Sequence, residues 1–132
     1  MKRLLVTLSL ALICIVRLKA SSLITNPVVI VTPTTIDFGS VKAKTTVTNT
    51  FLVENAGGGK LVGKATVAPP FKIISGESYS LKENAAQVVI IIYTPSHASN
   101  DTQTVTFSGG GGAKVPVTGR LGGAPPGTTK RP

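Results

Sequence analysis

Few side chains in this sequence have the chemistry that hydrolysis or metal binding requires. His97 is the only histidine, and within its segment, residues 95–101, Asp101 is the only acidic residue. A zinc site needs three or four N, S or O ligands, so a metal here would lack partners. A Ser-His-Asp triad could be drawn from His97 with Asp37 or Asp101, but no segment resembles a nucleophile elbow. We therefore expect neither a metal nor a triad, and we interpret His97 as a solvated loop residue.

The other candidate chemistries lack support in the spacing. The five carboxylates are spread over separate predicted turns and strands, so a glycosidase pair would need Glu77 and Glu83 to converge on folding. Residues 57–63 and 109–112 are rich in glycine, but each segment joins two predicted strands and opens no helix. They are therefore predicted to be hairpin turns and not phosphate-binding loops. The sequence predicts a non-enzyme with no catalytic residues, no cofactor and no metal.

Residues 1–20 have the pattern of a secretory signal peptide. Lys2 and Arg3 precede an apolar run over residues 4–16, and the small Ala20 offers a cleavage position. The run is shorter than the roughly 20 apolar residues that a membrane-spanning helix needs. We expect residues 1–20 to be removed on export, and the alternative is an uncleaved membrane anchor.

The chain after this leader must be stable without covalent or metal cross-links. Cys14 is the only cysteine and lies inside the apolar run, so no disulfide or thiolate zinc site can form later in the chain. Residues 120–132 are rich in Gly and Pro, and we predict a flexible tail there. Residues 21–32 are expected to be a linker or first edge strand, which leaves residues 33–119 as the domain.

The net charge of +9 does not indicate nucleic-acid binding. Four of the fourteen basic residues lie in the leader, and residues 35–119 contain seven lysines against five acidic residues, with neither Arg nor Trp. Nucleic-acid modules need clustered Arg and Lys with aromatic platforms between them. With 42% apolar and 14% charged residues, the middle of the chain is expected to fold and to bind no nucleic acid.

Apolar residues alternate with polar ones between residues 28 and 119, and turn residues recur about every ten positions, as in short antiparallel strands. We predict an all-β fold, an immunoglobulin-like antiparallel β-sandwich of about seven or eight strands, with a barrel as the alternative. The expected strands cover residues 28–38 (interrupted at Pro33), 45–54, 61–67, 71–75, 79–81, 87–94, 102–108 and 114–118. The expected core is Phe38, Phe51, Leu61, Phe71, Tyr79, Leu81, Val89, Ile91, Tyr93, Val105 and Phe107.

The segment 87–93 departs from a plain sandwich pattern because both of its faces are apolar. If its odd-numbered residues face the core, Val88, Ile90 and Ile92 face outward, where Thr or Ser would be expected. This stripe is a possible protein-contact surface. The interpretation we prefer is a central strand whose outer face is covered by residues 23–31.

Several phrases of the domain, taken in order, resemble a known family. Residues 35–41 are Thr-Ile-Asp-Phe-Gly-Ser-Val and residues 50–57 are Thr-Phe-Leu-Val-Glu-Asn-Ala-Gly; Ile-Tyr-Thr-Pro at 92–95 and Val-Pro-Val-Thr-Gly at 115–119 follow. Over residues 33–119 this pattern resembles the ASH-type immunoglobulin-like domains of abnormal-spindle and hydin proteins, and the similar choice-of-anchor D repeats of secreted bacterial proteins. The resemblance implies a non-enzymatic β-sandwich with no shared catalytic residues.

The leader and the resemblance together predict a non-catalytic, secreted or periplasmic immunoglobulin-like module with a binding or structural role. Its expected partner is a protein or the cell-envelope surface, and it would contact a membrane only through an uncleaved leader. The alternative is a cytoplasmic, ciliary or centrosomal adaptor of the ASH/hydin kind, in which residues 1–20 remain as an anchor. We make no prediction of the oligomeric state from the sequence.

Overall fold

The computed structural model describes residues 26–122, and within this range the chain forms nine β-strands and no helix. The predicted signal peptide and most of the predicted tail lie outside the described residues. The strands are β1 (Val29–Thr32), β2 (Ile36–Val41), β3 (Val47–Asn55), β4 (Leu61–Thr66), β5 (Phe71–Ser75), β6 (Ser78–Leu81), β7 (Ala86–Tyr93), β8 (Asn100–Phe107) and β9 (Ala113–Leu121). The all-β prediction is therefore confirmed, and β9 runs three residues past its expected end.

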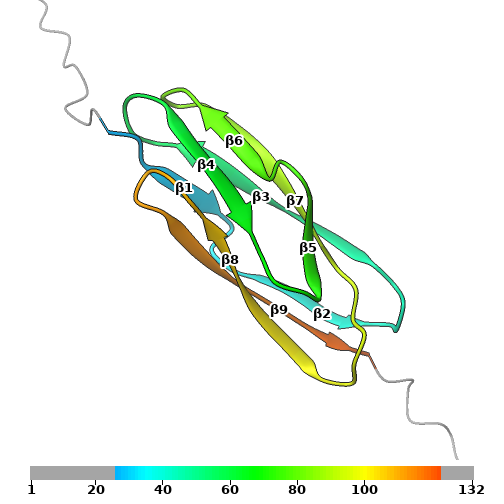
Figure 1. Cartoon of the computed structure of the whole chain (residues 1–132). Coiled ribbons are helices and arrows are strands. Elements are labelled where there is room, and N and C mark those ends of the chain that lie inside the picture. The colour runs from blue at the N-terminus through cyan, green and yellow to red at the C-terminus, as the bar shows by residue number, and fades with distance from the viewer. Residues whose placement is uncertain (1–25, 123–132) are drawn as a thin grey trace, which may run out of the picture.

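The strands form two sheets that pack face to face (Figure 1). Sheet A has the order β1-β3-β7-β5, and sheet B has the order β2-β9-β8-β4-β6. A β-sandwich, and not a barrel, is therefore the architecture of the described residues. The two ends of this part of the chain, Asn26 and Gly122, lie at opposite ends of the long axis (Figure 1).

Two details of the topology differ from the prediction. The interruption at Pro33 separates two strands in different sheets, β1 in sheet A and β2 in sheet B, which accounts for the ninth strand. Proline lacks the N–H that a continuous ladder needs, so the chain changes sheets there. β2 also pairs with β9 in parallel, with Ile36 opposite Val117, whereas all the other pairs of neighbouring strands are antiparallel as expected.

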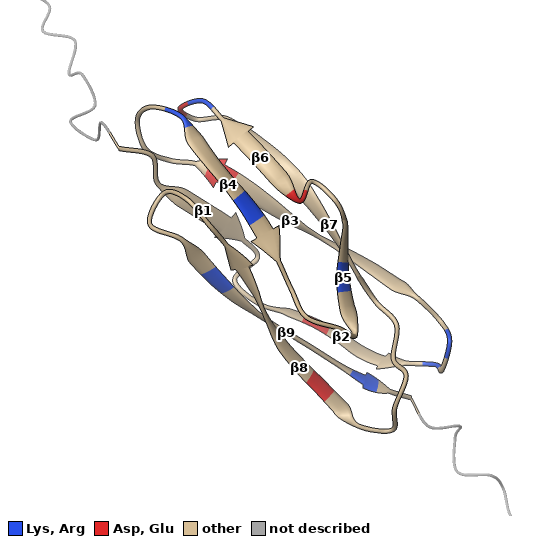
Figure 2. Cartoon of the chain, in the orientation of Figure 1, with Lys and Arg blue, Asp and Glu red and all other residues tan. Residues whose placement is uncertain are grey.

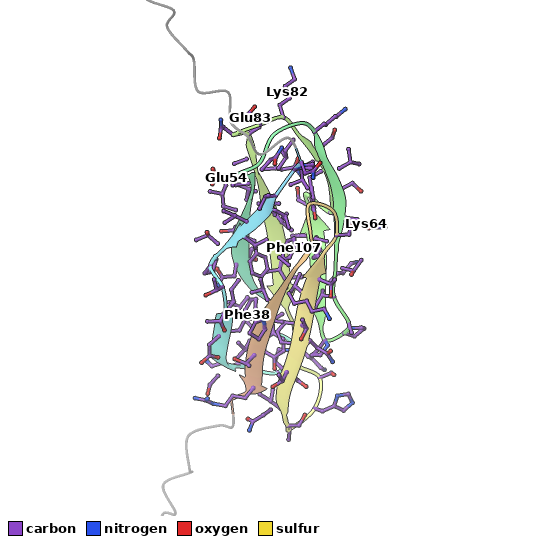
Figure 3. All side chains as sticks on the ribbon, turned by 90° about the vertical axis from the view of Figure 1, so that its left-hand side faces the viewer. Phe38, Glu54, Lys64, Lys82, Glu83 and Phe107 are labelled. Carbon is purple, nitrogen blue, oxygen red and sulfur yellow. The ribbon has the colours of Figure 1, made fainter. Side chains whose placement is uncertain are left out.

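The side chains between the sheets form one hydrophobic core, and all eleven predicted core residues are buried in it. Phe38, Phe71 and Tyr93 form an aromatic cluster in which the ring centroids lie 4.7–5.6 Å apart. Phe51 and Phe107 meet edge to face at 5.3 Å. Figure 3 shows the labelled Phe38 and Phe107 between the two sheets. Each fully buried side chain of this kind contributes about 1.5–3 kcal/mol to folding.

The two glycine-rich segments serve different connections. Residues 109–112 join β8 to β9, which pair antiparallel, so the predicted hairpin is confirmed there. Residues 57–59 lead from β3 in sheet A to β4 in sheet B, and these two strands do not pair, so the hairpin prediction is wrong for this segment. A Cβ on Gly57 would lie 2.2 Å from the carbonyl oxygen of Asn26, so this crossing requires a residue without a side chain.

Candidate functional site

The residues considered for catalysis do not come together in the structure. His97 lies in the exposed loop between β7 and β8, where its Nδ1 is 2.7 Å from the hydroxyl of Ser96. Asp37 accepts a hydrogen bond from the N–H of Gly39 at 2.8 Å, and Asp101 accepts one from the Tyr93 hydroxyl at 2.7 Å. Residues 26–122 contain no group of three or more His, Cys, Asp or Glu side chains that could hold a metal.

The two glutamates considered as a pair are also separated. Glu77 lies just before β6 and forms an ion pair with Lys64, with 2.6 Å between Nζ and Oε1. Glu83 lies in the turn after β6, so the whole length of that strand separates the two carboxylates. Lys82 and Glu83 are labelled at one end of the sandwich in Figure 3. Nothing in this arrangement places an acid and a base on opposite sides of one bond.

The buried hydroxyls belong to the core and not to a catalytic site. Burial raises the pKa of Tyr93 well above its ordinary value, and its hydrogen bond to Asp101 and the charge of that carboxylate raise it further. Burial likewise raises the pKa of Tyr79, partly offset by its hydrogen bond to the carbonyl oxygen of Ser108. Both tyrosines therefore stay protonated at neutral pH and act as hydrogen-bond donors. The Tyr93 bond joins β7 of sheet A to β8 of sheet B, and the Tyr79 bond joins β6 to the residue after β8.

The outward side of β7 is the predicted stripe. Val89, Ile91 and Tyr93 are fully buried, and the alternation of a strand turns the residues between them to the other face. Val88 is 49% exposed, whereas Ile90 and Ile92 are half-buried by their neighbours. The orientation of the stripe therefore agrees with the sequence pattern.

Neighbouring strands extend this apolar surface beyond β7. On β3, Leu52 lies opposite Val88 and is 44% exposed. On β1, Ile30 lies opposite Glu54 and diagonal to Leu52, whose direct partner is Thr32, and it is 46% exposed. We refer to Ile30, Leu52, Val88, Ile90 and Ile92 as the sheet-A face. Threonines at positions 32, 48 and 50 and the half-buried Glu54 share this outward side, so polar side chains lie among the apolar ones.

Residues 26–31, the described part of the expected cover, do not lie over the sheet-A face, contrary to the interpretation we preferred from the sequence. β1 pairs with β3 at the edge of the same sheet, with Val31 opposite Val53, so it extends the face and does not lie over β7. The backbone hydrogen-bonding groups of β1 are satisfied by the edge of β3, which favours this position. Residues 23–25, which belonged to the expected cover, lie outside the described residues.

The opposite surface of the sandwich has a different character. Outward positions of sheet B are mainly threonine, serine and lysine, and Val62, which is 63% exposed, is its one large hydrophobic residue above half exposure. Acidic and basic residues are scattered over both sheets and their turns (Figure 2). The apolar character is therefore specific to sheet A.

Sequence comparisons gave no match, either to a protein family model or to a curated protein. Solved structures do match the fold. The ASH/PapD-like domain 7 of human CEP192 superposes with a TM-score of 0.62 at 15% identity, covering 76% of this chain and 89% of that domain. The chain has the ASH/PapD-like immunoglobulin fold. This confirms, at the level of the fold, the resemblance seen in the sequence.

Bacterial proteins share the same ASH/PapD-like fold. A Porphyromonas gingivalis protein of unknown function matches with a TM-score of 0.64 at 15% identity, covering 80% of this chain and 51% of that one. The Escherichia coli chaperone DraB matches with a TM-score of 0.56 at 12% identity, covering 70% of this chain and 54% of DraB. The present chain thus spans about half the length of these two bacterial proteins.

Among residues 26–122, the structure contains no helix with the length and apolar character needed to cross a membrane.

Proposed function

We propose that this chain is an exported, non-catalytic protein-binding module and that the sheet-A face is its contact surface. The observation that carries the proposal is the exposure of Ile30, Leu52 and Val88 on three adjacent strands, at 44–49% each. Contiguous apolar surface of this kind marks interaction sites, because covering it removes hydrocarbon from water at a gain of about 0.8 kcal/mol per methylene group.

Other observations favour a protein as the partner over a nucleic acid. The chain has four Phe, two Tyr and no Trp, and all six aromatic side chains are buried, so none is available to stack on a base. The chaperone DraB has the same fold, which adds support for a role in protein binding. Export is supported by the signal-like pattern of residues 1–20.

Photo-crosslinking tests the sheet-A face directly. We expect a photoreactive phenylalanine analogue at Val88 to give a discrete adduct with one partner in the producing cells, whereas the same analogue at Val62 on sheet B gives none. Adding Leu52→Thr should lower the yield at position 88 about fivefold, since truncation of a central contact costs about 1 kcal/mol. Leu52 and Val88 are both exposed, so replacing them should change the free energy of unfolding by about 0.5 kcal/mol or less.

Position 88 is a sharper probe than Ile90 or Ile92, because those two side chains are half-buried and their replacement would also lower stability. Equal adducts from positions 62 and 88, or no adduct from either, would show that the sheet-A face is not a contact surface. An adduct with the mass of two copies of this chain would identify the partner as the protein itself.

The intact mass of the full-length protein, expressed with a C-terminal tag, tests export. We expect the mass to fall by that of residues 1–20, and the shortened protein to lie in the periplasm or the medium. Unprocessed protein in the membrane fraction would make the leader an anchor. Unprocessed soluble protein in the cytosol would favour an adaptor of the ASH/hydin kind, a candidate supported by the likeness to the CEP192 domain.

A further inference from the structure

The connection between β4 and β5 leaves a seam of the sandwich open. The chain leaves sheet B at Thr66, crosses over residues 67–70, and enters sheet A at Phe71. β6 pairs with β4 as far as Lys64, which lies opposite Ser78, and the N–H of Ala65 donates to the carbonyl oxygen of Glu77 at 2.7 Å. Thr66, the last residue of β4, therefore has no strand beside it on that edge. β5 pairs with β7 alone. Figure 1 shows β5 at the border of the sandwich, next to this crossing.

A groove with a volume of about 530 Å³ lies at this seam. Volumes of this size hold small ligands or a few side chains of a peptide. We define the seam groove by its lining, which includes Thr66, Val67, Pro69, Lys72, Ile73 and Ile92. Most of these side chains are apolar, and Ile92 also belongs to the sheet-A face, so the two surfaces meet there.

The backbone of β5 has hydrogen-bonding groups that face away from β7. The N–H of Phe71 donates to the carbonyl oxygen of Ala68 at 3.3 Å, and so points into the crossing. Residues of an antiparallel strand direct their N–H and C=O groups alternately toward the partner strand and away from it. The backbone groups of Ile73, two residues later, therefore face the free edge, where a further extended chain could pair with them.

The charges at the groove are unequal. Lys64 and Glu77 form an ion pair with each other. Lys72 lies next to Ile73 and forms no ion pair with any of residues 26–122. The groove therefore carries one uncompensated positive charge beside a free strand edge, and a carboxylate is the side chain that complements it.

We propose that the seam groove binds a short extended peptide segment of a partner protein, which pairs with the backbone of Ile73, places an apolar side chain in the groove and directs a carboxylate to Lys72. The inference rests on the proposed protein-binding function and names a partner class for a second surface. Backbone pairing would give affinity and the alternate side chains specificity. A symmetric pairing of two β5 edges is disfavoured, because it would bring two uncompensated Lys72 side chains close together.

Selection of random ten-residue peptides on the full chain, as purified from producing cells, tests the proposal. We expect enriched peptides to alternate apolar residues with Asp or Glu. A selected peptide should bind the Lys72→Glu variant about tenfold more weakly than it binds the original chain. A version of that peptide in which lysine replaces the acidic residue should show the reverse preference and bind the Lys72→Glu variant more tightly than the original chain. Lys114→Glu, the same charge change on β9, should leave binding unchanged. Thr66→Trp, which fills the groove from an exposed position, should abolish binding without lowering the melting temperature.

The position of the bound peptide separates this inference from the proposed function. Amide chemical-shift changes at Val67, Ile73 and Thr94 are expected. Changes at Leu52 and Val88 instead would move the peptide to the sheet-A face, which overturns the groove inference and leaves the proposed function standing. No enrichment, or binding that survives both Lys72→Glu and Thr66→Trp, would also overturn it. A dimer in sedimentation that Thr66→Trp dissociates would make the occupant a second copy, and the peptide proposal would be wrong.

Discussion

Replacement of Asn55 by alanine is expected to lower the free energy of unfolding by about 3–5 kcal/mol, because four backbone groups would lose their partner. Apart from the tyrosines, Asn55 has the one buried polar side chain among the described residues, with 0% exposure. Its Oδ1 accepts hydrogen bonds from the N–H groups of Val28 at 3.2 Å and Gly57 at 3.1 Å. Its Nδ2 donates to the carbonyl oxygens of Gly59 at 3.1 Å and Leu81 at 3.2 Å.

These bonds join the start of β1, the crossing after β3 and the end of β6, so the amide holds three segments that no other side chain connects in the same way. A domain of this size has about 5–15 kcal/mol of stability in all, so the loss should be plain in urea unfolding. Asn55→Asp should be similarly destabilising, because it replaces both donated bonds by a buried charge. A fall below about 1 kcal/mol for Asn55→Ala would show that water replaces the amide.

Asn49→Ala provides the matched control on the same strand. Asn49 is exposed, and its Oδ1 accepts only from the N–H of the next residue, Thr50, at 3.0 Å. We expect a change of about 0.5 kcal/mol or less. The bond from the Val28 N–H to Asn55 fixes the start of β1, which carries Ile30 of the sheet-A face. Asn55→Ala should therefore loosen β1 and weaken photo-crosslinking at position 88, whereas Asn49→Ala should not.

Asn55 also illustrates what the sequence could not predict. Phe51 was predicted to lie in the core and is buried, and Val53, two residues later on the same side of β3, is buried with it. Asn55 is two residues after Val53 and so points to the same side of β3. An asparagine close to several glycines, however, is typical of a turn, so the sequence indicated a turn there and not a buried side chain. Its burial depends on partners 26 and 27 residues away, Leu81 and Val28, which a local pattern does not contain.

The sheet-A face was predictable in orientation but not in extent. Alternation along residues 87–93 was enough to turn Val88, Ile90 and Ile92 outward, because period two is a local property of a strand. Leu52 and Ile30 join them only through the registers of β3 with β7 and β1 with β3. Alternation in β3 turns Leu52 outward, but a pattern within one strand cannot show which strand lies beside it. The expected cover was wrong for residues 26–31 for the same reason, since the place of β1 depends on its pairing with β3.

The seam groove left still less trace in the sequence. It exists because β6 stops short of the end of β4 and because the chain changes sheets at residues 67–70. The prolines at 69 and 70 lie in the gap between the expected strands 61–67 and 71–75, and that gap is confirmed, but a gap between two strands of one sheet would look the same. Lys72 likewise has no ion-pair partner among residues 26–122 because Glu77 pairs with Lys64, and this pairing depends on the tertiary structure.

Gly63→Ala is expected to lower the free energy of unfolding by about 2–4 kcal/mol, through overpacking and a lost hydrogen bond. A Cβ at this position would lie 2.0 Å from the carbonyl oxygen of Ser108 and 2.5 Å from Cε2 of Tyr79. Gly63 lies directly opposite Tyr79 in the β4–β6 pair, and the Tyr79 hydroxyl donates to the same carbonyl oxygen. With a methyl group at position 63, the Tyr79 ring and the Ser108 carbonyl cannot both keep their positions, so β4 must move away from one of them.

Val62→Ala is the matched control, because Val62 is the preceding residue of β4 and is 63% exposed. We expect it to lower the free energy of unfolding by about 0.5 kcal/mol or less, and urea unfolding measures both variants. Equal effects of the two substitutions would contradict the close packing of Tyr79 over Gly63. The displacement should also reach the seam groove through the next residue, Lys64. Its N–H donates to the hydroxyl oxygen of Ser108 at 2.8 Å, and its side chain forms the ion pair with Glu77. Loss of peptide binding in Gly63→Ala would therefore follow from the moved strand, and only Lys72→Glu and Thr66→Trp probe the groove itself.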